Sequence, residues 1–352
     1  MGQIFQGLRL RLRREHLGFP LDRVLSPFRG VVLPDAHISI FFDFYRPPYG
    51  GGNQFLLALR KELKRRGFRV ENNVISTTTR ACLFNSYNFN FEQLHQDWEL
   101  RKNQSKQERP LMIHRVDGPI ALYRDMPDDP TDKKIVKFNQ ELPADKTIFQ
   151  SRYSMEAHEV LGLDLKSPKI IMNAVAPDIF YPAEHRAGPR GRKVRLISTS
   201  WSSNPNKGEE TYKWLDQHLD WSRYEYTFMG RTKATFGNIS IVEPQGSHAV
   251  ADELRRHDIY IAASRNDPCS NALLEALACG LPAIYAASGG HPEIVGEAGF
   301  GFSSPEAVPA LLDRLVDEYE QRRERIAIPT LARVADQYLS VMGLEACAQA
   351  QP

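Results

Sequence analysis

The sequence predicts an α/β protein in which two doubly wound domains face a central cleft. Apolar, strand-like runs alternate with amphipathic helical stretches along most of the chain, a pattern typical of parallel sheets covered by helices on both faces. The chain has 352 residues, enough for two domains at roughly 150 residues per domain. A stretch rich in proline and glycine, residues 169–193, separates two such alternating series and indicates an inter-domain linker.

The composition is that of an ordinary globular protein and excludes several classes. Hydrophobic residues make up 42% and charged residues 25% of the chain, which disfavours disorder. No window of 18 apolar residues predicts a transmembrane helix, and no secretion signal opens the chain. The net charge of +2 does not indicate a nucleic-acid partner. Four cysteines without metal-ligand or disulfide spacing favour a reduced, cytoplasmic compartment: Cys82, Cys269, Cys279 and Cys347.

Residues 1–36 form a basic N-terminal extension. Its first 30 residues carry six arginines against Glu15 and Asp22, a net charge of +4. Apolar residues recur at helical spacing from Ile4 to Leu12, so this segment can form a basic amphipathic helix that lies on the inner face of an anionic membrane. A solvated or loosely docked extension remains an equal alternative.

The N-terminal domain is expected over residues 37–175. Its strands are predicted where apolar runs are short and bounded by turn residues, and its helices where the period is 3.6. A glycine-rich loop, Gly50-Gly51-Gly52, joins the first strand to the first helix. The predicted strands are 37–43, 69–75, 81–85, 111–116 and 147–150, and the predicted helices are 53–66, 91–106 and 152–161.

The C-terminal domain is expected over residues 194–330, after a linker placed at 176–193. A second strand–helix series fills it, and residues 331–352 form a last helix and tail. Ligands of such sheets bind beyond the carboxyl ends of the strands, so the cleft between the domains is the expected site. The predicted strands are 194–200, 225–229, 239–242, 259–263 and 283–286, and the predicted helices are 209–218, 250–256, 271–279, 305–325 and 330–342.

The stretch from Asn266 to Gly280 is the most informative part of the sequence. Pro268 suits a first helical position, with Asp267 as N-cap and Gly280 as C-terminal cap. The free N–H groups of the first turn, near Ser270 and Asn271, would face the cleft, where they can bind phosphate. Glu275 is the odd residue in this apolar helix, because a buried carboxylate needs hydrogen-bond donors and a ribose diol offers two. A helix cap and a core ion pair are the structural alternatives for the two acids.

Asp267-x7-Glu275 in this stretch resembles the Glu-x7-Glu signature of the retaining family 4 glycosyltransferases of the GT-B fold, within the group 1 glycosyltransferases. The run from Ala287 to Val295 also resembles that family. This sequence departs from the signature at the first acid, which is Asp, and at Cys269-Ser270 in place of Phe-Gly. The resemblance implies that Glu275 binds the ribose and Asp267 the donor sugar.

Two cations follow strands of the C-terminal domain. Lys207 lies in the loop that begins at Ser200, directly before a helix, where a lysine opposes the helix dipole unless an anion binds there too. By resemblance, Lys207 contacts the donor diphosphate, and Ser200 belongs to the same nucleotide-binding loop. Arg231 follows the next strand and is a candidate for a second phosphate contact. A solvated surface cation is the alternative for each.

Two sites of the N-terminal domain are expected to face the donor. Gly51 and Gly52 allow the backbone to approach a phosphate. His114, at the end of a strand, corresponds by resemblance to a histidine presented to the donor hexose, and Asp117 is a candidate acceptor-side group. A structural ion pair of Arg115 with Asp117 beside a satisfied His114 is the alternative.

The resemblance implies a metal-independent retaining hexosyltransferase that uses a nucleotide diphosphate sugar. It needs no cofactor besides the donor, and its acceptor would be a glycan or lipid-linked hydroxyl in glycan, glycolipid or polysaccharide biosynthesis. The departing phosphate can take the acceptor proton, so the protein's main task is electrostatic. A catalytically weak sugar-nucleotide-binding partner and another GT-B enzyme, such as a sugar-nucleotide epimerase, remain alternatives. A nicotinamide dehydrogenase is disfavoured because no dinucleotide fingerprint follows a first strand.

Overall fold

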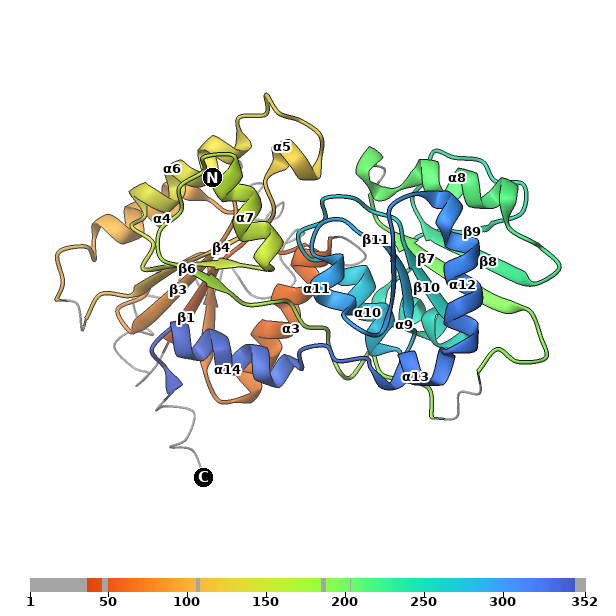
Figure 1. Ribbon diagram of the computed structural model, residues 1–352. Helices are drawn as coiled ribbons and strands as arrows, with labels where there is room; N and C mark the ends of the chain where they lie inside the picture. Colours follow the sequence, from red (N-terminus) through yellow and green to blue (C-terminus); the bar gives the residue numbers. More distant parts are fainter. Residues whose placement is uncertain (1–36, 46–49, 106–107, 185–187, 203, 346–352) are drawn as a thin grey trace, which may run out of the picture.

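Two parallel sheets, each covered by helices, form two lobes that lie side by side (Figure 1). The computed structural model describes residues 37–45, 50–105, 108–184, 188–202 and 204–345. The basic extension predicted over residues 1–36 lies outside the described residues, so its membrane contact stays a prediction. The predicted architecture of two doubly wound Rossmann-like sheets is confirmed.

The N-terminal lobe is built on a sheet whose strands all run parallel, in the order β2-β1-β3-β4-β5-β6. Its central strands are buried, as expected of a sheet covered on both faces. The strand order reverses direction beside β1, and ligands bind at such a switch point. The strands are β1 (His37–Phe41), β2 (Arg69–Asn72), β3 (Thr79–Asn85), β4 (Leu111–Val116), β5 (Lys146–Phe149) and β6 (Pro168–Ile170).

Helices of this lobe connect successive strands. The first of them, α3, runs from Gly51 to Arg65 and begins at the glycine loop after β1. Its N-cap, Gly50, has φ 61°, a left-handed conformation that suits glycine. The helices are α3 (Gly51–Arg65), α4 (Phe91–Glu99), α5 (Ile120–Tyr123), α6 (Thr131–Glu141) and α7 (Arg152–Val160).

The C-terminal lobe has a second parallel sheet, in the order β12-β11-β10-β7-β8-β9. Its switch point lies between β7 and β10, so the loops after these two strands open into the cleft. The strands are β7 (Val194–Ser200), β8 (Tyr224–Gly230), β9 (Ser240–Val242), β10 (Ile259–Ala262), β11 (Ala283–Ala286) and β12 (Gly299–Phe302). The helices are η1 (Pro205–Lys207), α8 (Glu209–His218), α9 (Ser247–Arg256), α10 (Asn271–Ala278), α11 (His291–Val295), η2 (Pro305–Ala307), α12 (Val308–Asp317) and α13 (Tyr319–Glu324).

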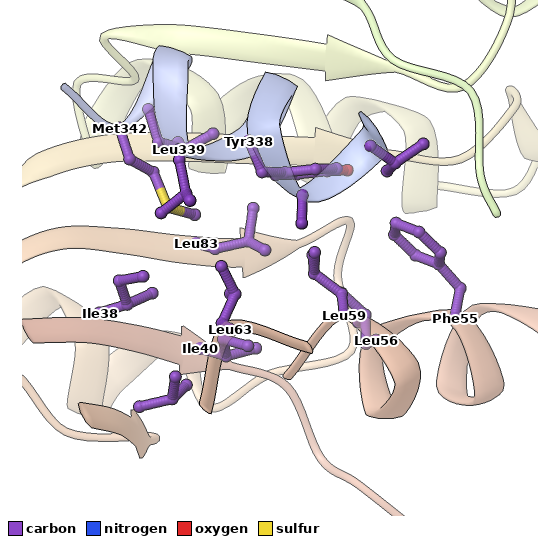
Figure 2. Close-up of a cluster of buried hydrophobic side chains, with 14 of the residues drawn as sticks. Ile38, Ile40, Phe55, Leu56, Leu59, Leu63, Leu83, Tyr338, Leu339 and Met342 are labelled. Atoms are coloured by element: carbon purple, nitrogen blue, oxygen red, sulfur yellow. The ribbon is translucent and has the colours of Figure 1, made fainter. Parts of the chain in front are cut away.

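The last helix, α14 (Leu331–Val341), returns to the N-terminal lobe and packs against α3. Figure 2 shows Tyr338, Leu339 and Met342 directed at the side chains of α3, β1 and β3. All three side chains are fully buried in one core cluster with Leu59 and Leu83. The first and last described elements, β1 and α14, therefore lie in the same lobe, and the chain crosses between the lobes twice.

Several predicted elements differ from the structure. The helix predicted over 305–325 is divided into η2, α12 and α13, because the chain turns at Glu318 between the last two. The predicted helix 91–106 ends at Glu99. Strand β6 overlaps the start of the proline- and glycine-rich stretch 169–193 and was not predicted. Four further elements were not predicted either: α5, α6, α11 and β12.

No helix in the part of the chain that the structure describes is long and apolar enough to cross a membrane.

Candidate functional site

The cleft between the lobes encloses about 1520 Å³, counted out to its open mouth. Its lining comes from the loops that follow β1, β3 and β4 on one wall and β7 and β10 on the other. Eight predicted site residues line it: Gly51, Gly52, Ser200, Lys207, Asp267, Ser270, Asn271 and Glu275. The two lobes thus bring together residues that lie more than 200 positions apart in the chain.

Lys207 and Asp267 form a buried ion pair on the C-terminal wall. The Lys207 Nζ lies 2.8 Å from Asp267 Oδ2, and the two side chains are only 22% and 6% exposed. Burial alone would lower the pKa of Lys207, but the Asp267 carboxylate and Tyr123 beside it outweigh that effect and raise it. Burial likewise opposes ionisation of Asp267, yet Lys207 holds the pKa of that carboxyl below its usual value. Both groups are therefore charged at neutral pH.

Asp267 does not cap the following helix, which corrects the prediction. Helix α10 begins at Asn271, and its N-cap is Ser270, whose hydroxyl accepts from the Leu273 N–H at 3.4 Å. Asp267 instead accepts from the Cys269 N–H at 3.2 Å, in a turn before the helix. This turn directs the Asp267 carboxylate at Lys207. The expected C-terminal cap at Gly280 is confirmed by its φ of 83° and its bond to the Leu277 carbonyl.

Glu275 lies in α10 with its carboxyl group at the cleft. The carboxyl group has no hydrogen-bond or ion-pair partner among the described residues, although only 9% of the residue is exposed. Burial raises the pKa of Glu275 to about 8. A ligand that donates hydrogen bonds would supply what this carboxyl group lacks, since an unpaired buried polar group is costly.

Two helix N-termini open into the cleft from opposite walls. Residues 50–54 of α3 and 268–272 around the start of α10 both line it. The first-turn N–H groups of a helix have no acceptor within the helix and carry partial positive charge. The walls meet closely here, because a Cβ on Gly51 would lie 2.3 Å from Asn271 Nδ2. Any larger residue at position 51 would require the Asn271 side chain to shift.

A polar network built around Arg115 supports Asp117 at the cleft wall. The Arg115 side chain is fully buried and donates to Asn85, to Asp117 Oδ1 at 3.2 Å and to Asn173 Oδ1 at 2.8 Å. Asn173 donates in turn to Asn271 Oδ1 at 3.1 Å, which links the network to α10. The ion pair of Arg115 with Asp117, weighed as a structural alternative, is present, and Asp117 also lines the cleft.

His114 does not face the cleft, which corrects its predicted contact with the donor. Its ring is fully buried, stacks on Phe84 with centroids 4.4 Å apart and donates from Nε2 to the Ser86 carbonyl at 2.9 Å. Nδ1 accepts from Asn139 Nδ2 at 3.1 Å. Burial lowers the pKa of His114 to about 3, so the ring is neutral. The satisfied core histidine is the interpretation that the structure supports.

Arg231 is the other predicted residue that the structure leaves outside the cleft lining. It is exposed at the end of β8, where its N–H donates to the Ser200 carbonyl at 2.8 Å. Ser200 itself lines the cleft at the end of β7. The two strand ends are adjacent, but only one of the predicted cations, Lys207, reaches the cleft.

Sequence reasoning missed the contribution of the segment 119–124, which carries α5. Tyr123 and Arg124 line the cleft from the N-terminal wall, and the Tyr123 ring centroid lies 5.1 Å from Lys207 Nζ. Trp201, after β7, also lines the cleft and was not singled out. No periodicity or motif marks the 119–124 segment, because its one helical turn is too short to give a pattern.

No cluster of three or more His, Cys, Asp or Glu side chains suited to a metal ion occurs among the described residues. The three described cysteines, Cys82, Cys269 and Cys279, are buried, and none of them forms a disulfide.

Comparison with known families supports the assignment of the C-terminal lobe. Residues 224–319 match the family model described as "Glycosyl transferases group 1". The match spans the sheet from β8 to β12, including α10 with Asp267 and Glu275. No curated protein matches the sequence closely enough to count as a relative.

Solved structures with the same fold cover nearly the whole chain. Sucrose-phosphate synthase from Thermosynechococcus elongatus is 14% identical, with a TM-score of 0.60 over 90% of this chain and 96% of its own. The catalytic domain of starch synthase IV from Arabidopsis thaliana, bound to ADP and acarbose, is 10% identical, with a TM-score of 0.63 over 89% and 99%. Anabaena HepE in complex with UDP and glucose is 13% identical, with a TM-score of 0.58 over 89% and 97%. The chain has the GT-B fold, and the resemblance to group 1 glycosyltransferases is confirmed.

Proposed function

We propose that this chain, whose C-terminal lobe is a group 1 glycosyltransferase domain, transfers a hexose from a nucleotide diphosphate sugar to an acceptor hydroxyl with retention of configuration. The observation that carries the proposal is the carboxyl group of Glu275, which has no partner among the described residues and lines the same cleft as the Lys207–Asp267 pair, at the carboxyl ends of β7 and β10. A ribose diol, a diphosphate and a sugar hydroxyl are the groups that these three side chains would bind.

The positive charge of the site is arranged for a departing diphosphate. Lys207 is held charged at the cleft, and the first turns of α3 and α10 add partial positive charge from both walls. Charge that develops on the leaving phosphate is stabilised best by groups that are already oriented. HepE, whose fold this chain shares, was solved with UDP and glucose, which supports the same class of donor here.

The proposed reaction needs no protein base. The bond between the anomeric carbon and the diphosphate oxygen breaks, and the acceptor oxygen bonds to that carbon on the same face. The acceptor proton passes to the leaving phosphate oxygen, whose charge Lys207 and the helix N-termini offset. In this proposal Asp267 holds donor sugar hydroxyls, and Asp117 lies on the acceptor side. The role given to Lys207 and the helix N-termini is the one that a metal ion fills in other transferases, so we propose a metal-independent reaction.

A binding panel tests this function. Uridine diphosphate, guanosine diphosphate and their sugar conjugates would be titrated, in the presence of EDTA, into the native chain and into the variants Glu275→Ala and Lys207→Ala. Arg333→Gln, on the exposed face of α14, is the control. We expect one nucleotide series to bind, at least tenfold weaker binding by both cleft variants, and native affinity for the control. Failure of every nucleotide to bind the native chain contradicts the proposal.

Lys207→Ala needs a folding control, because it leaves a buried carboxylate unpaired, at a cost of about 3–5 kcal/mol. The double variant Lys207→Ala/Asp267→Asn also lacks the lysine, but it has no unpaired carboxylate at position 267. It should recover stability in thermal denaturation but not nucleotide affinity. Binding without any turnover, with or without an acceptor, would instead favour a sugar-nucleotide-binding partner protein.

A further inference from the structure

The charges that line the described part of the cleft do not balance an anionic donor. Lys207 and Arg124 are the only cationic side chains among them, against the carboxyl groups of Asp117, Asp267 and Glu275. The Lys207 charge is already matched by Asp267 at 2.8 Å. A diphosphate adds further negative charge, which the partial charges of the helix N-termini offset only in part, so tight binding calls for a second cation that is not held in an ion pair by a protein carboxylate.

Arg124 meets that requirement. It is the C-cap residue of α5 on the N-terminal wall, and its guanidinium makes no hydrogen bond or ion pair with any described residue. It is exposed and lines the cleft. Its charge also reaches Tyr87 and Asp129 of the same lobe. Burial raises the pKa of Tyr87 and Arg124 opposes that rise, while hydrogen bonds from Thr131 and the charge of Arg124 lower the pKa of Asp129, with which Arg124 forms no ion pair.

The backbone beside Arg124 is fixed to the opposite lobe at the Lys207 loop. Asn204 Nδ2 donates to the Tyr123 carbonyl at 3.0 Å, and Asn206 Nδ2 donates to the Leu122 carbonyl at 3.0 Å. Asn266 Nδ2 donates to the same Leu122 carbonyl at 3.3 Å. The 119–124 segment is thus held where Tyr123 lies over Lys207, one residue from Arg124.

We propose that Arg124 is the second cation of the diphosphate site and is supplied across the cleft by the N-terminal lobe. The inference rests on the proposed function and adds a substrate-binding residue to it. Arg124 and Lys207 then approach the diphosphate from opposite walls. The phosphate site is therefore complete only when the 119–124 segment is bound by Asn204, Asn206 and Asn266. A planar guanidinium suits two phosphate oxygens at once.

Arg231 is the competing candidate, and the geometry disfavours it. It lies outside the cleft lining at the end of β8 and has other interaction partners. Because both arginines are exposed, replacing either with glutamine should leave the fold intact, which makes a direct comparison feasible.

The test compares a diphosphate with the nucleoside that lacks it. Dissociation constants for UDP, GDP, uridine and guanosine would be measured by ligand-observed NMR and calorimetry on the full chain. The proteins would be the native chain, Arg124→Gln, Arg124→Lys, Arg231→Gln and Arg333→Gln, each checked by thermal denaturation. Arg333, exposed on α14 and away from the cleft, is the matched control.

We expect Arg124→Gln to weaken diphosphate binding at least tenfold and to leave nucleoside binding unchanged, with partial recovery in Arg124→Lys. Arg231→Gln and Arg333→Gln should bind both ligands as the native chain does. Native diphosphate affinity in Arg124→Gln, or an equal loss for nucleoside and diphosphate, overturns the inference while the proposed function stands. If the native chain binds no nucleotide, the proposed function fails and the inference fails with it.

Discussion

Glu275 shows how a single residue can carry a functional argument. Its carboxyl group is buried at the cleft without a described partner, and that burial raises its pKa to about 8. The free protein therefore holds this group mostly protonated at neutral pH. A folded-state pKa above the unfolded value means that its ionisation costs stability as pH rises from about 4.5 to 8. A core residue without function would rarely be left in this state.

Nucleotide binding should depend on pH through Glu275. A ribose diol donates to the ionised carboxylate. Below the pKa of about 8 that Glu275 has in the free protein, its carboxyl group is protonated, so nucleotide binding must release that proton. We expect nucleotide affinity to rise with pH between about 6.5 and 8, by up to tenfold per pH unit, and then to level off. Calorimetry in buffers of different ionisation enthalpy would detect the released proton.

Glu275→Gln provides the control for that pH dependence. It keeps the shape of the side chain and cannot titrate, whereas the ligand phosphate, with a pKa near 6, titrates equally in both proteins. The variant should lose the slope above pH 6.5. An identical slope in native and variant proteins would assign the pH dependence to another group.

Helix α14 stabilises a lobe other than the one that precedes it in the chain. It follows the C-terminal lobe in the chain but completes the core of the N-terminal lobe, where it covers α3 and the strands beside it (Figure 2). The stability of the N-terminal lobe therefore depends on the last part of the described chain. The amphipathic pattern of residues 330–342 predicts the helix, but nothing in that pattern says which lobe its apolar face covers.

Replacing a buried side chain of α14 should destabilise the N-terminal lobe. Leu339→Ala removes a side chain that is 1% exposed, and we expect a loss of about 2–5 kcal/mol in the free energy of unfolding. Ser340→Ala, at the exposed neighbouring position, should change it by less than about 0.5 kcal/mol. Hydrogen exchange would place the loss: faster exchange in β1 and α3 is expected, and faster exchange confined to β7 and β8 would contradict this packing.

The whole molecule is held with its lobes together by polar contacts across the cleft. Glu293 of α11 accepts from the Arg152 and Tyr153 N–H groups at 2.9 and 2.8 Å, in the first turn of α7 of the other lobe. The asparagine side chains that bind the 119–124 segment belong to the same interface, and the Tyr153 hydroxyl joins the two sets of contacts by donating to Asn266 Oδ1 at 3.2 Å. Closure of this kind excludes water from the reacting groups.

Weakening both sets of contacts should open the molecule. The double variant Asn206→Ala/Glu293→Ala removes an asparagine contact to the 119–124 segment and the two hydrogen bonds from the first turn of α7, and we expect a larger radius of gyration by small-angle X-ray scattering in the absence of nucleotide. Glu324→Ala, exposed on α13, serves as control. A double variant as compact as the native chain would show that apolar packing and the linker alone hold the lobes.

The sequence predicts the alternation of strands and helices well because buried parallel strands give short apolar runs. It fails where a strand lacks that signal. β12 reads Gly-Phe-Gly-Phe, and glycine is unfavourable in strands, yet a Cβ on Gly299 would lie 1.8 Å from the Ala283 carbonyl oxygen. Such a close approach between strands depends on a tertiary contact and cannot be read from local composition.

The candidate site shows the same contrast between residues that a local motif predicts and residues whose position depends on tertiary contacts. Lys207, Asp267 and Glu275 lie near strand ends in a recognisable motif and meet in the cleft, as their positions imply. His114 lies within β4, before the carboxyl end of the strand, and both faces of this sheet are covered by helices, so its ring packs in the core. Asp117, just beyond the end of the same strand, lines the cleft. Arg124 depends on how one lobe docks on the other, which the sequence does not encode locally.

One measurement tests glycosyl transfer most directly: proton NMR of the sugar released from an α-linked nucleotide diphosphate hexose, in EDTA, without acceptor. The donor would be the one selected by the binding panel, with water taking the acceptor's place. If the transfer proceeds with retention, the α anomer is released slowly, before mutarotation, and Lys207→Ala/Asp267→Asn loses that release. Release of the β anomer would contradict retention, and no release even when acceptor glycans are added would contradict a transferase.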